Sequence, residues 1–271
     1  MTKIIKVPGI NGLNKTRGCE KAPDLMLEEL KNIYTNESGK EIKTKDLDIS
    51  EIEIEGSNIE EMSKKIYEKS LEIFKNKEKT IFLGGDHSIS FSIGKAFFEN
   101  NKNSGKESCL IVFDAHPDLM QPVSSDAPTH EEWLRGLIES TGISGENILL
   151  VGVRNSDKKE LDFIKEKQIK QINCNSIEED IDNIADTIME FTSSRETYLS
   201  LDIDVIDPAF ASGTGYCEVG GLTSRQLFYL LSRIKKIKSL KAVDLVEINP
   251  LLDNKNKSTV KLGTKILKEL I

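Results

Sequence analysis

The chain has few of the residues and segments that would assign it to several common protein classes. It contains four cysteines, and no two of them have the CxxC spacing of a zinc or redox motif. No apolar run approaches the roughly 18–20 residues needed to cross a bilayer. The first residues also lack the roughly 7–15-residue apolar segment of a secretory leader. We therefore expect a soluble protein of the reducing cytoplasm with no membrane partner.

Basic residues are in the minority as well. The chain has 37 Lys and Arg against 45 Asp and Glu, which gives a net charge of −8, and its basic residues are dispersed among acidic ones. This distribution argues against a nucleic-acid partner. A linker is also missing, because the most polar stretches, 100–107 and 253–258, are short and closely flanked by apolar segments. The sequence therefore predicts a single domain over residues 1–271.

Short β-type runs alternate with longer amphipathic segments along most of the chain. We expect strands at 3–7, 80–83, 109–113, 147–151, 197–201 and 240–246, and helices after 22–24, at 58–75, 88–98, 131–140, 158–167, 177–191 and 224–234, and from 259. This alternation predicts an α/β fold with a mostly parallel sheet covered on both faces. Parallel strands place their carboxyl ends along one edge of the sheet, so the segments that follow the strands should converge there.

Histidine is scarce, and two of the three histidines lie within a concentrated set of carboxylates. The three segments are Gly84-Gly-Asp86-His87-Ser, Asp114-Ala-His116-Pro-Asp118 and Ser200-Leu-Asp202-Ile-Asp204-Val-Ile-Asp207-Pro. Each segment follows or includes the end of an expected strand. The spacing of two in the second and third segments points their polar side chains to one side if the backbone stays extended. Helix caps and turn formers would not produce this repeated placement at strand ends.

Imidazole and carboxylate ligands together suit a divalent ion, with manganese as the first choice. Asp114 and Asp202 can each bridge two ions through their two oxygens. The other ligands then form one pair for each ion, His87 with Asp118 and His116 with Asp204. Four carboxylates balance two divalent ions, which offsets the cost of burying charge. Two ions about 3.5–4 Å apart can share a water, lower its pKa and present hydroxide to a trigonal carbon. The pattern therefore predicts two Mn²⁺ per chain and a hydrolytic site without a nucleophilic side chain.

These motifs resemble those of the arginase–agmatinase (ureohydrolase) family. The resemblance runs from about residue 82 to 250 and includes Ser212-Gly-Thr-Gly215, Gly220-Gly-Leu222 and Glu247-Ile-Asn-Pro250. It implies a three-layer α/β/α fold, a binuclear manganese centre, a trimer or hexamer, and hydrolysis of a small cationic guanidino substrate to an amine and urea. The family's six ligand positions are matched by His87, Asp114, His116, Asp118, Asp202 and Asp204.

The resemblance also implies roles for two residues outside the ligand set. Glu247 matches the acidic residue that holds the guanidinium, and a carboxylate suits that planar, charged group through two parallel hydrogen bonds. His130 lies near the position of a proton-shuttle histidine, and an ordinary imidazole titrates close to neutral pH. Together with the ligand Asp118, these are the expected catalytic residues.

The chain departs from the family pattern where the substrate tail is expected. Residues 129–135 read Thr-His-Glu-Glu-Trp-Leu-Arg where family members usually have His-Gly, so we expect Trp133 near the mouth of the site. Met120 stands where arginases carry an Asn that recognises the amino-acid head group, which favours agmatine over arginine. Asp157 instead resembles an arginase position that meets the α-amino group. Cys217 occupies a position where proline is frequent, in the loop after the third carboxylate segment.

An agmatinase-type ureohydrolase is therefore the main hypothesis, and three alternatives stay open. The first is arginase or another amidinohydrolase of guanidino compounds. The second is a catalytically weak member that binds a guanidino metabolite as a regulator, which manganese-dependent urea release would exclude. The third is an amidohydrolase similar to histone deacetylases, which metal analysis would separate because it resembles a single-zinc site.

Overall fold

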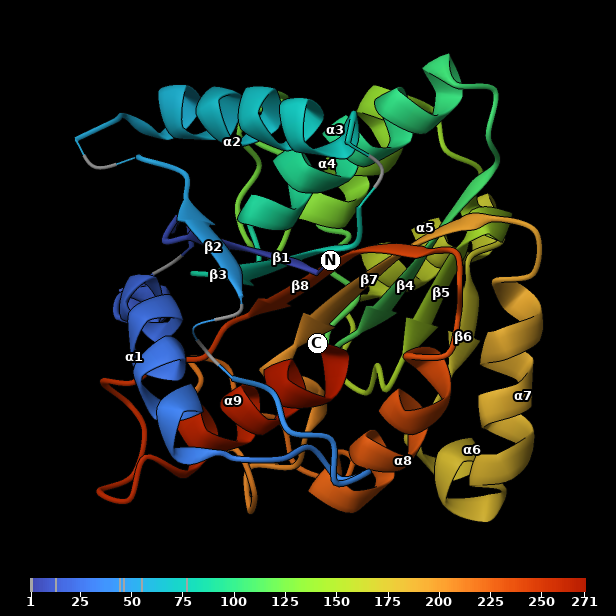
Figure 1. Cartoon of the computed structure of the whole chain (residues 1–271). Helices are drawn as coiled ribbons and strands as arrows, with labels where there is room; N and C mark the ends of the chain where they lie inside the picture. The colour runs from blue at the N-terminus through green and yellow to red at the C-terminus, as the bar shows by residue number, and fades with distance from the viewer. Residues whose placement is uncertain (1, 13, 44, 46, 55, 77) are drawn as a thin grey trace.

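The fold is built around a central parallel sheet. The computed structural model describes residues 2–12, 14–43, 45, 47–54, 56–76 and 78–271. Its eight-stranded sheet has the order β2-β1-β3-β8-β7-β4-β5-β6, and each pair of neighbours is parallel (Figure 1). The strands are β1 (Lys3–Val7), β2 (Asp48–Glu51), β3 (Thr80–Gly84), β4 (Ser108–Phe113), β5 (Ile148–Val151), β6 (Lys170–Ile172), β7 (Glu196–Asp202) and β8 (Leu240–Val246).

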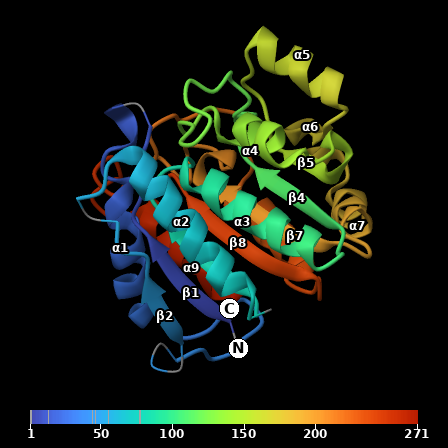
Figure 2. The same ribbon diagram turned by 90° about the horizontal axis from the view of Figure 1, so that it is seen from above.

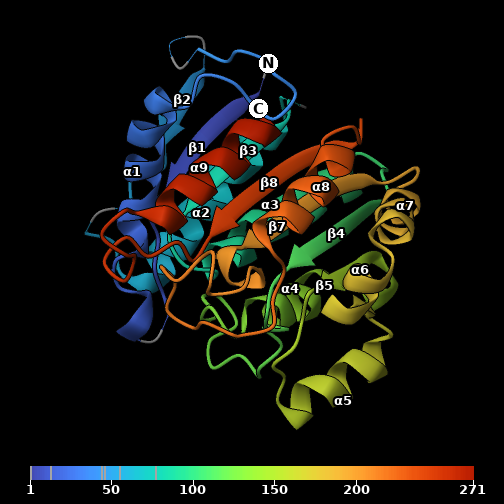
Figure 3. The same ribbon diagram turned by 90° about the horizontal axis from the view of Figure 1, so that it is seen from below.

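Helices cover both faces of this sheet. One face carries α2 (Ile59–Phe74), α3 (Ile89–Asn103) and α4 (Trp133–Thr141), which pack side by side, with α5 (Lys158–Lys167) beyond them (Figure 2). The other face carries α1 (Ala22–Glu29), α9 (Ser258–Leu270), α8 (Ser224–Ile234), α7 (Ile181–Phe191) and α6 (Cys174–Glu179) (Figure 3). The expected three-layer α/β/α, arginase-like architecture is confirmed.

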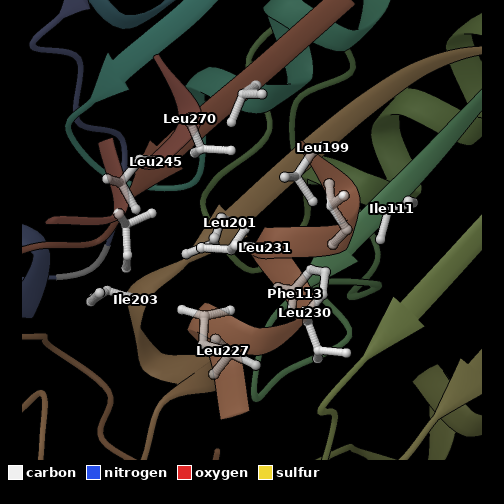
Figure 4. Close-up of a cluster of buried hydrophobic side chains, with 14 of the residues drawn as sticks. Ile111, Phe113, Leu199, Leu201, Ile203, Leu227, Leu230, Leu231, Leu245 and Leu270 are labelled. Carbon is white, nitrogen blue, oxygen red and sulfur yellow. The ribbon is translucent and has the colours of Figure 1, made fainter. Parts of the chain in front are cut away.

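The two faces are fixed by alternation along the buried strands. In β4, Cys109, Ile111 and Phe113 belong to the apolar cluster beneath α8 and α9, whereas Leu110 and Val112 belong to the cluster beneath α3 and α4. Successive side chains of a strand point to opposite faces, so one strand supplies both cores. Figure 4 shows the first cluster, in which leucines of α8 pack on side chains of β4, β7 and β8.

Local capping explains where several helices begin. Pro23 lies in the first turn of α1, as expected of a residue with no N–H to donate. Thr223 and Gln226 form a reciprocal capping box at the start of α8. Asp157 and Glu160 form a second capping box at the start of α5.

The structure differs from the expected elements in two respects. It adds β2 and β6, which sequence reading missed because they are short, polar edge strands without an apolar pattern. It also divides the helix expected at 177–191. Asp180 leaves the helical conformation and its side chain accepts a hydrogen bond from the Asn183 N–H, so it ends α6 and caps α7. In the described part of the chain, no helix is long and apolar enough to cross a membrane.

Candidate metal centre

The three motif segments and Glu247 meet at one edge of the sheet. They follow β3, β4, β7 and β8, which are neighbours in the order β3-β8-β7-β4. All strands run in the same direction, so the loops at their carboxyl ends lie together. The segments are far apart in sequence and become one site through the topology of the sheet.

The first group of candidate metal-binding atoms surrounds one nitrogen of His87. The Nδ1 atom lies 3.0 Å from Asp114 Oδ2, 3.1 Å from Asp118 Oδ2 and 3.2 Å from Asp202 Oδ2. All four side chains are at least nine-tenths buried. An imidazole nitrogen can donate at most one proton, so three carboxylates around it exceed its hydrogen-bonding capacity. His87 Nδ1 and Asp114 Oδ2 are in fact buried without a hydrogen-bond partner among the described residues. These atoms therefore fit a cation better than they fit one another.

The second group lies beside the first and shares Asp114 with it. His116 Nδ1 is 2.9 Å from Asp204 Oδ2 and 3.6 Å from Asp114 Oδ1. The groups His87–Asp114–Asp118 and Asp114–His116–Asp204 each have a geometry that can hold a metal ion. Asp202 faces the first group through Oδ2, while its Oδ1 accepts a hydrogen bond from the Asp204 backbone N–H. Bridging by Asp202 stays a prediction.

Backbone N–H groups orient the carboxylates before any ion binds. Asp114 Oδ1 accepts a hydrogen bond from the His116 N–H at 2.7 Å, and Asp204 Oδ1 accepts one from the Ala115 N–H at 2.9 Å. In both cases the other oxygen remains directed at a histidine. The spacing of two in each motif therefore aligns the side chains and also lets one ligand's backbone hold another ligand's carboxylate.

The carboxylates create a strongly negative environment. Burial lowers the pKa of His116, but the neighbouring Asp114 and Asp204 outweigh it and raise that pKa to about 12. The pKa of His87 is also raised well above its usual value, against the effect of burial, by the carboxylates around it. Burial and the charges of Asp118 and Asp204 raise the pKa of Asp114 to about 7. Divalent cations neutralise such a cluster more fully than protons do, and they bind the deprotonated ligands.

Glu247 and His130 stand next to the first group. Glu247 has a positive φ of 61°, and its Oε1 accepts a hydrogen bond from the His87 N–H at 3.0 Å. His130 Nδ1 lies 3.4 Å from the same Oε1, and the Nε2 of His130 is buried without a hydrogen-bond partner among the described residues. Burial lowers the pKa of His130, but Glu247 beside it raises that pKa to about 9.

A cavity of about 280 Å³ opens above these residues. Its walls contain three of the candidate ligand aspartates (Asp118, Asp202 and Asp204), His116, His130 and Glu247, together with Met120, Glu131, Asn155, Asp157, Glu160, Thr214 and Tyr216. Sequence reading missed the contributions of Asn155, Glu160, Thr214 and Tyr216 to this wall. The sequence signal for Glu160 is its place three residues after Asp157, which is the spacing of a capping box.

Comparison with known proteins agrees with this geometry. The family model described as the Arginase family matches residues 2–271. The chain belongs to the arginase family. An arginase of Staphylococcus aureus (strain MRSA252) is 31% identical over 281 residues, covering 93% of this chain and 91% of the relative. An agmatinase of Bacillus subtilis (strain 168) is 30% identical over 190 residues, covering 70% of this chain and 61% of the relative. The crystal structure of a formimidoylglutamase from Bacillus subtilis subsp. subtilis str. 168 superposes with a TM-score of 0.88 at 23% identity, covering 99% of this chain and 85% of that one.

Two tail positions of this arginase-family chain differ from expectation in their surroundings. Trp133 is not at the mouth. It is 0% exposed, and its indole N–H donates a hydrogen bond to Asp118 beneath the cavity. Placement at the mouth was wrong because Trp133 begins α4 and its side chain points inward, against Asp118 and His87. Asp157 does line the cavity, but its Oδ1 caps α5 by accepting a hydrogen bond from the Lys159 N–H at 2.8 Å.

Sequence reading also missed a polar chain behind His87. His87 Nε2 lies 2.8 Å from Ser200 Oγ, and the Ser200 hydroxyl donates a hydrogen bond to Asp244 Oδ1 at 2.8 Å. Ser90 and Tyr198 donate to the other oxygen of Asp244. Such contacts set the orientation and tautomer of a ligating histidine. The available signal was a single aspartate within the apolar run of β8.

Proposed function

We propose that this arginase-family chain catalyses the manganese-dependent hydrolysis of agmatine to putrescine and urea. The observation that carries the proposal is the pair of buried ligand groups that share Asp114, with His87 Nδ1 and Asp114 Oδ2 lacking hydrogen-bond partners among the described residues. Nitrogen and oxygen ligands of this kind suit manganese. When bound, two such ions supply Lewis-acid activation of water for attack on the guanidino carbon.

The protein's own groups hold the substrate's guanidinium. Glu247 Oε1 is oriented by the His87 N–H, so its carboxylate is fixed at the cavity wall rather than free to rotate. A fixed carboxylate accepts paired hydrogen bonds from a guanidinium and matches its charge. The guanidino carbon is then held beside the ligands, which favours reaction through orientation.

His130 handles the proton. Its Nδ1 faces Glu247, and its Nε2 is buried without a hydrogen-bond partner among the described residues. The residue as a whole contributes to the cavity wall. Because Glu247 raises the pKa of His130 to about 9, the ring is protonated on both nitrogens and positively charged at neutral pH. It can therefore deliver that proton to the departing amine and recover one from water.

The choice of agmatine follows from the wall around the substrate tail. Met120 cannot donate a hydrogen bond to a carboxylate, and the acidic residues Glu131, Asp157 and Glu160 lie in the same wall. A cationic tail is attracted there, whereas the α-carboxylate of arginine would lose hydrogen bonds that it makes in water, at a cost of roughly 1–3 kcal/mol or more. We expect agmatine to be preferred in kcat/KM by at least about tenfold, the equivalent of ~1.4 kcal/mol.

The test is a screen of product release by the manganese-loaded protein. Urea is measured with agmatine, arginine, guanidinobutyrate and guanidine, and formamide is measured with formiminoglutamate. Agmatine should give the highest kcat/KM, and Glu247→Gln should raise KM for it because the neutral amide no longer matches the guanidinium charge. Equal or greater efficiency with arginine would overturn the agmatine proposal and leave the two-metal site standing.

Arginase is the second candidate. It is favoured by the 31% identity to the Staphylococcus aureus arginase and by the presence of Asp157 in the cavity wall, where it can meet an α-amino group. The single-zinc alternative is not supported, because the described residues form two ligand groups. Urea release would exclude the regulator alternative. A trimeric or hexameric assembly and a cytoplasmic location stay predictions.

A further inference from the structure

The chain's single tryptophan lies directly against two of the expected metal ligands. Trp133 Nε1 donates a hydrogen bond of 2.8 Å to Asp118 Oδ2. The indole also lies against the His87 imidazole, with ring centroids 4.6 Å apart and planes inclined by 33°. Trp133 is fully buried, so both contacts are shielded from water. One side chain thus touches a carboxylate ligand and a histidine ligand of the same group.

The contacted oxygen is the one that faces the ligand group. Asp118 Oδ2 is the atom that lies 3.1 Å from His87 Nδ1. A carboxylate oxygen has two lone pairs, so it can accept the indole proton on one side and bind a cation on the other. The backbone of Asp118 lies in the left-handed region, with a φ of 53°, which is uncommon for a residue other than glycine. Nearby packing must therefore hold this ligand in place, and the indole is in contact with its metal-facing oxygen.

Packing between two helices supports this contact. His87 lies in the turn that leads into α3, and Trp133 begins α4. These two helices pack against each other, so the imidazole and the indole are carried by neighbouring elements of one layer.

We propose that Trp133 is a positioning residue for the first ligand group, in which its N–H orients Asp118 Oδ2 and its ring fixes the plane of His87. The inference rests on the proposed function only in requiring the two-ion centre. The two ligand groups then differ in what orients them. Asp118 of the first group depends on a side chain of α4, whereas Asp204 of the second group is oriented by the Ala115 backbone N–H. Partners behind a ligand typically contribute 10–100-fold to metal affinity.

The sharpest test removes the indole N–H of Trp133 and keeps the shape of its ring. Because the chain has one tryptophan, growth with 3-benzothienylalanine, whose sulfur replaces the indole N–H, changes this position alone. Mn²⁺ is titrated calorimetrically into chelator-treated protein. His87→Ala and His116→Ala serve as references that assign the two binding events. We expect the event assigned to the first group to weaken about 10–100-fold, with the second changed by less than about threefold. Unchanged affinity at the first group, or equal loss at both, would overturn the proposal.

A second variant and a packing control separate positioning from stability. Trp133→Phe retains an aromatic ring and lacks the donor, so it should reproduce the selective loss. Ile138→Val trims another buried residue of α4 and should lower the melting temperature while leaving both affinities unchanged. If Ile138→Val weakened the first group to the same degree, general packing of α4 would explain the effect and the proposal would be overturned.

Emission from Trp133 gives an independent readout. Paramagnetic Mn²⁺ in the first group should quench it in the unmodified protein, with a midpoint equal to that of the first calorimetric event. The absence of quenching at saturation would contradict the placement of the indole. Protein that binds two ions and responds in this way but hydrolyses no guanidino compound would refute the proposed function and leave this inference intact. Protein that binds fewer than two ions would refute both.

Discussion

The two edges of the sheet both carry a cavity, but only one has the features of a reactive site. At the carboxyl ends of the strands the cavity measures about 280 Å³, and its wall contains buried aspartates and the buried His130. A larger cavity of about 450 Å³ lies where α3 and α4 end, lined by residues such as Glu99, Lys102, Lys106 and Ser140. The size of a cavity therefore does not identify the site. The candidate site is identified by buried polar atoms that converge and lack other hydrogen-bond partners.

The direction of the strands explains the difference. At the carboxyl edge, β3, β4, β7 and β8 deliver polar loops to one place. Several side-chain atoms there are buried without hydrogen-bond partners among the described residues, including His87 Nδ1, Asp114 Oδ2 and His130 Nε2. None of the described residues that line the larger cavity has such an atom. Lysines and glutamates are mixed in that wall, so no single sign of charge is concentrated there.

The largest effect should come from removing a carboxylate shared by both ligand groups. Asp114→Asn replaces a charged ligand by a neutral amide, so we expect loss of at least one ion per chain. Asp202→Asn should have the same effect, which tests the predicted bridging role of Asp202. Urea release should fall by more than about hundredfold, beyond the effect typical of residues that only support a ligand. Metal content is measured by atomic emission on purified protein. Lys102→Ala, an exposed residue of the opposite cavity, is the matched control and should change neither quantity. Full metal occupancy in Asp114→Asn would show that this carboxylate is not a shared ligand.

The next effect separates proton transfer from metal binding at the same edge. His130→Asn should retain two ions per chain, because this histidine lies against Glu247 and not within either ligand group. Turnover should fall by about 10²-fold, the range of general acid–base catalysis. The measurement is kcat as a function of pH, with metal content determined on the same samples. A variant with wild-type kcat across neutral pH would remove the shuttle role from His130.

A smaller effect should appear in the stability of chelator-treated protein. The pKa of His130 rises from an ordinary value near 6.5 to about 9 beside Glu247, so its contribution is present below pH ~6.5 and is lost as pH rises through about 9. Burial and neighbouring aspartates raise the pKa of Asp114 to about 7, so this group also makes stability fall between pH ~4 and 7. Both groups therefore make the folded state less stable as pH rises. The melting temperature should decrease from pH 5 to 9, and His130 should contribute up to roughly 3 kcal/mol of the accompanying fall in the free energy of unfolding. Manganese should reverse this trend, and a rise in melting temperature with pH without metal would contradict the assignment.

The smallest expected effect concerns Asp157, which can act as a helix cap and as a rim charge. Asn caps helices about as well as Asp, whereas Ala does not, at a cost of ~1 kcal/mol. Asp157→Asn should therefore keep the free energy of unfolding and raise KM for agmatine by up to about fivefold, the range of an exposed charge pair. Asp157→Ala should show the same change in KM together with the loss of stability. An unchanged KM in both variants would leave Asp157 with capping alone.

The candidate metal ligands were more predictable from the sequence than the residues packed around them. The spacing of Asp114, His116 and Asp118 is local information, and strand alternation together with parallel topology is enough to bring it to one edge. The polar chain through Ser200 and Asp244 was missed because its partners come from different strands and from α3. Trp133 was misplaced because its direction depends on where α4 begins. The edge strands β2 and β6 were missed because backbone pairing, and not an apolar pattern, defines them.

The most direct test of the central claim is urea release from agmatine measured against manganese bound per chain. Chelator-treated protein is titrated with Mn²⁺, and bound metal and initial rate are determined on each sample. A site made of two ligand groups that share Asp114 predicts that the rate continues to rise until two ions are bound and then stays constant. A maximal rate at one ion per chain, or no urea release at two, would contradict the account.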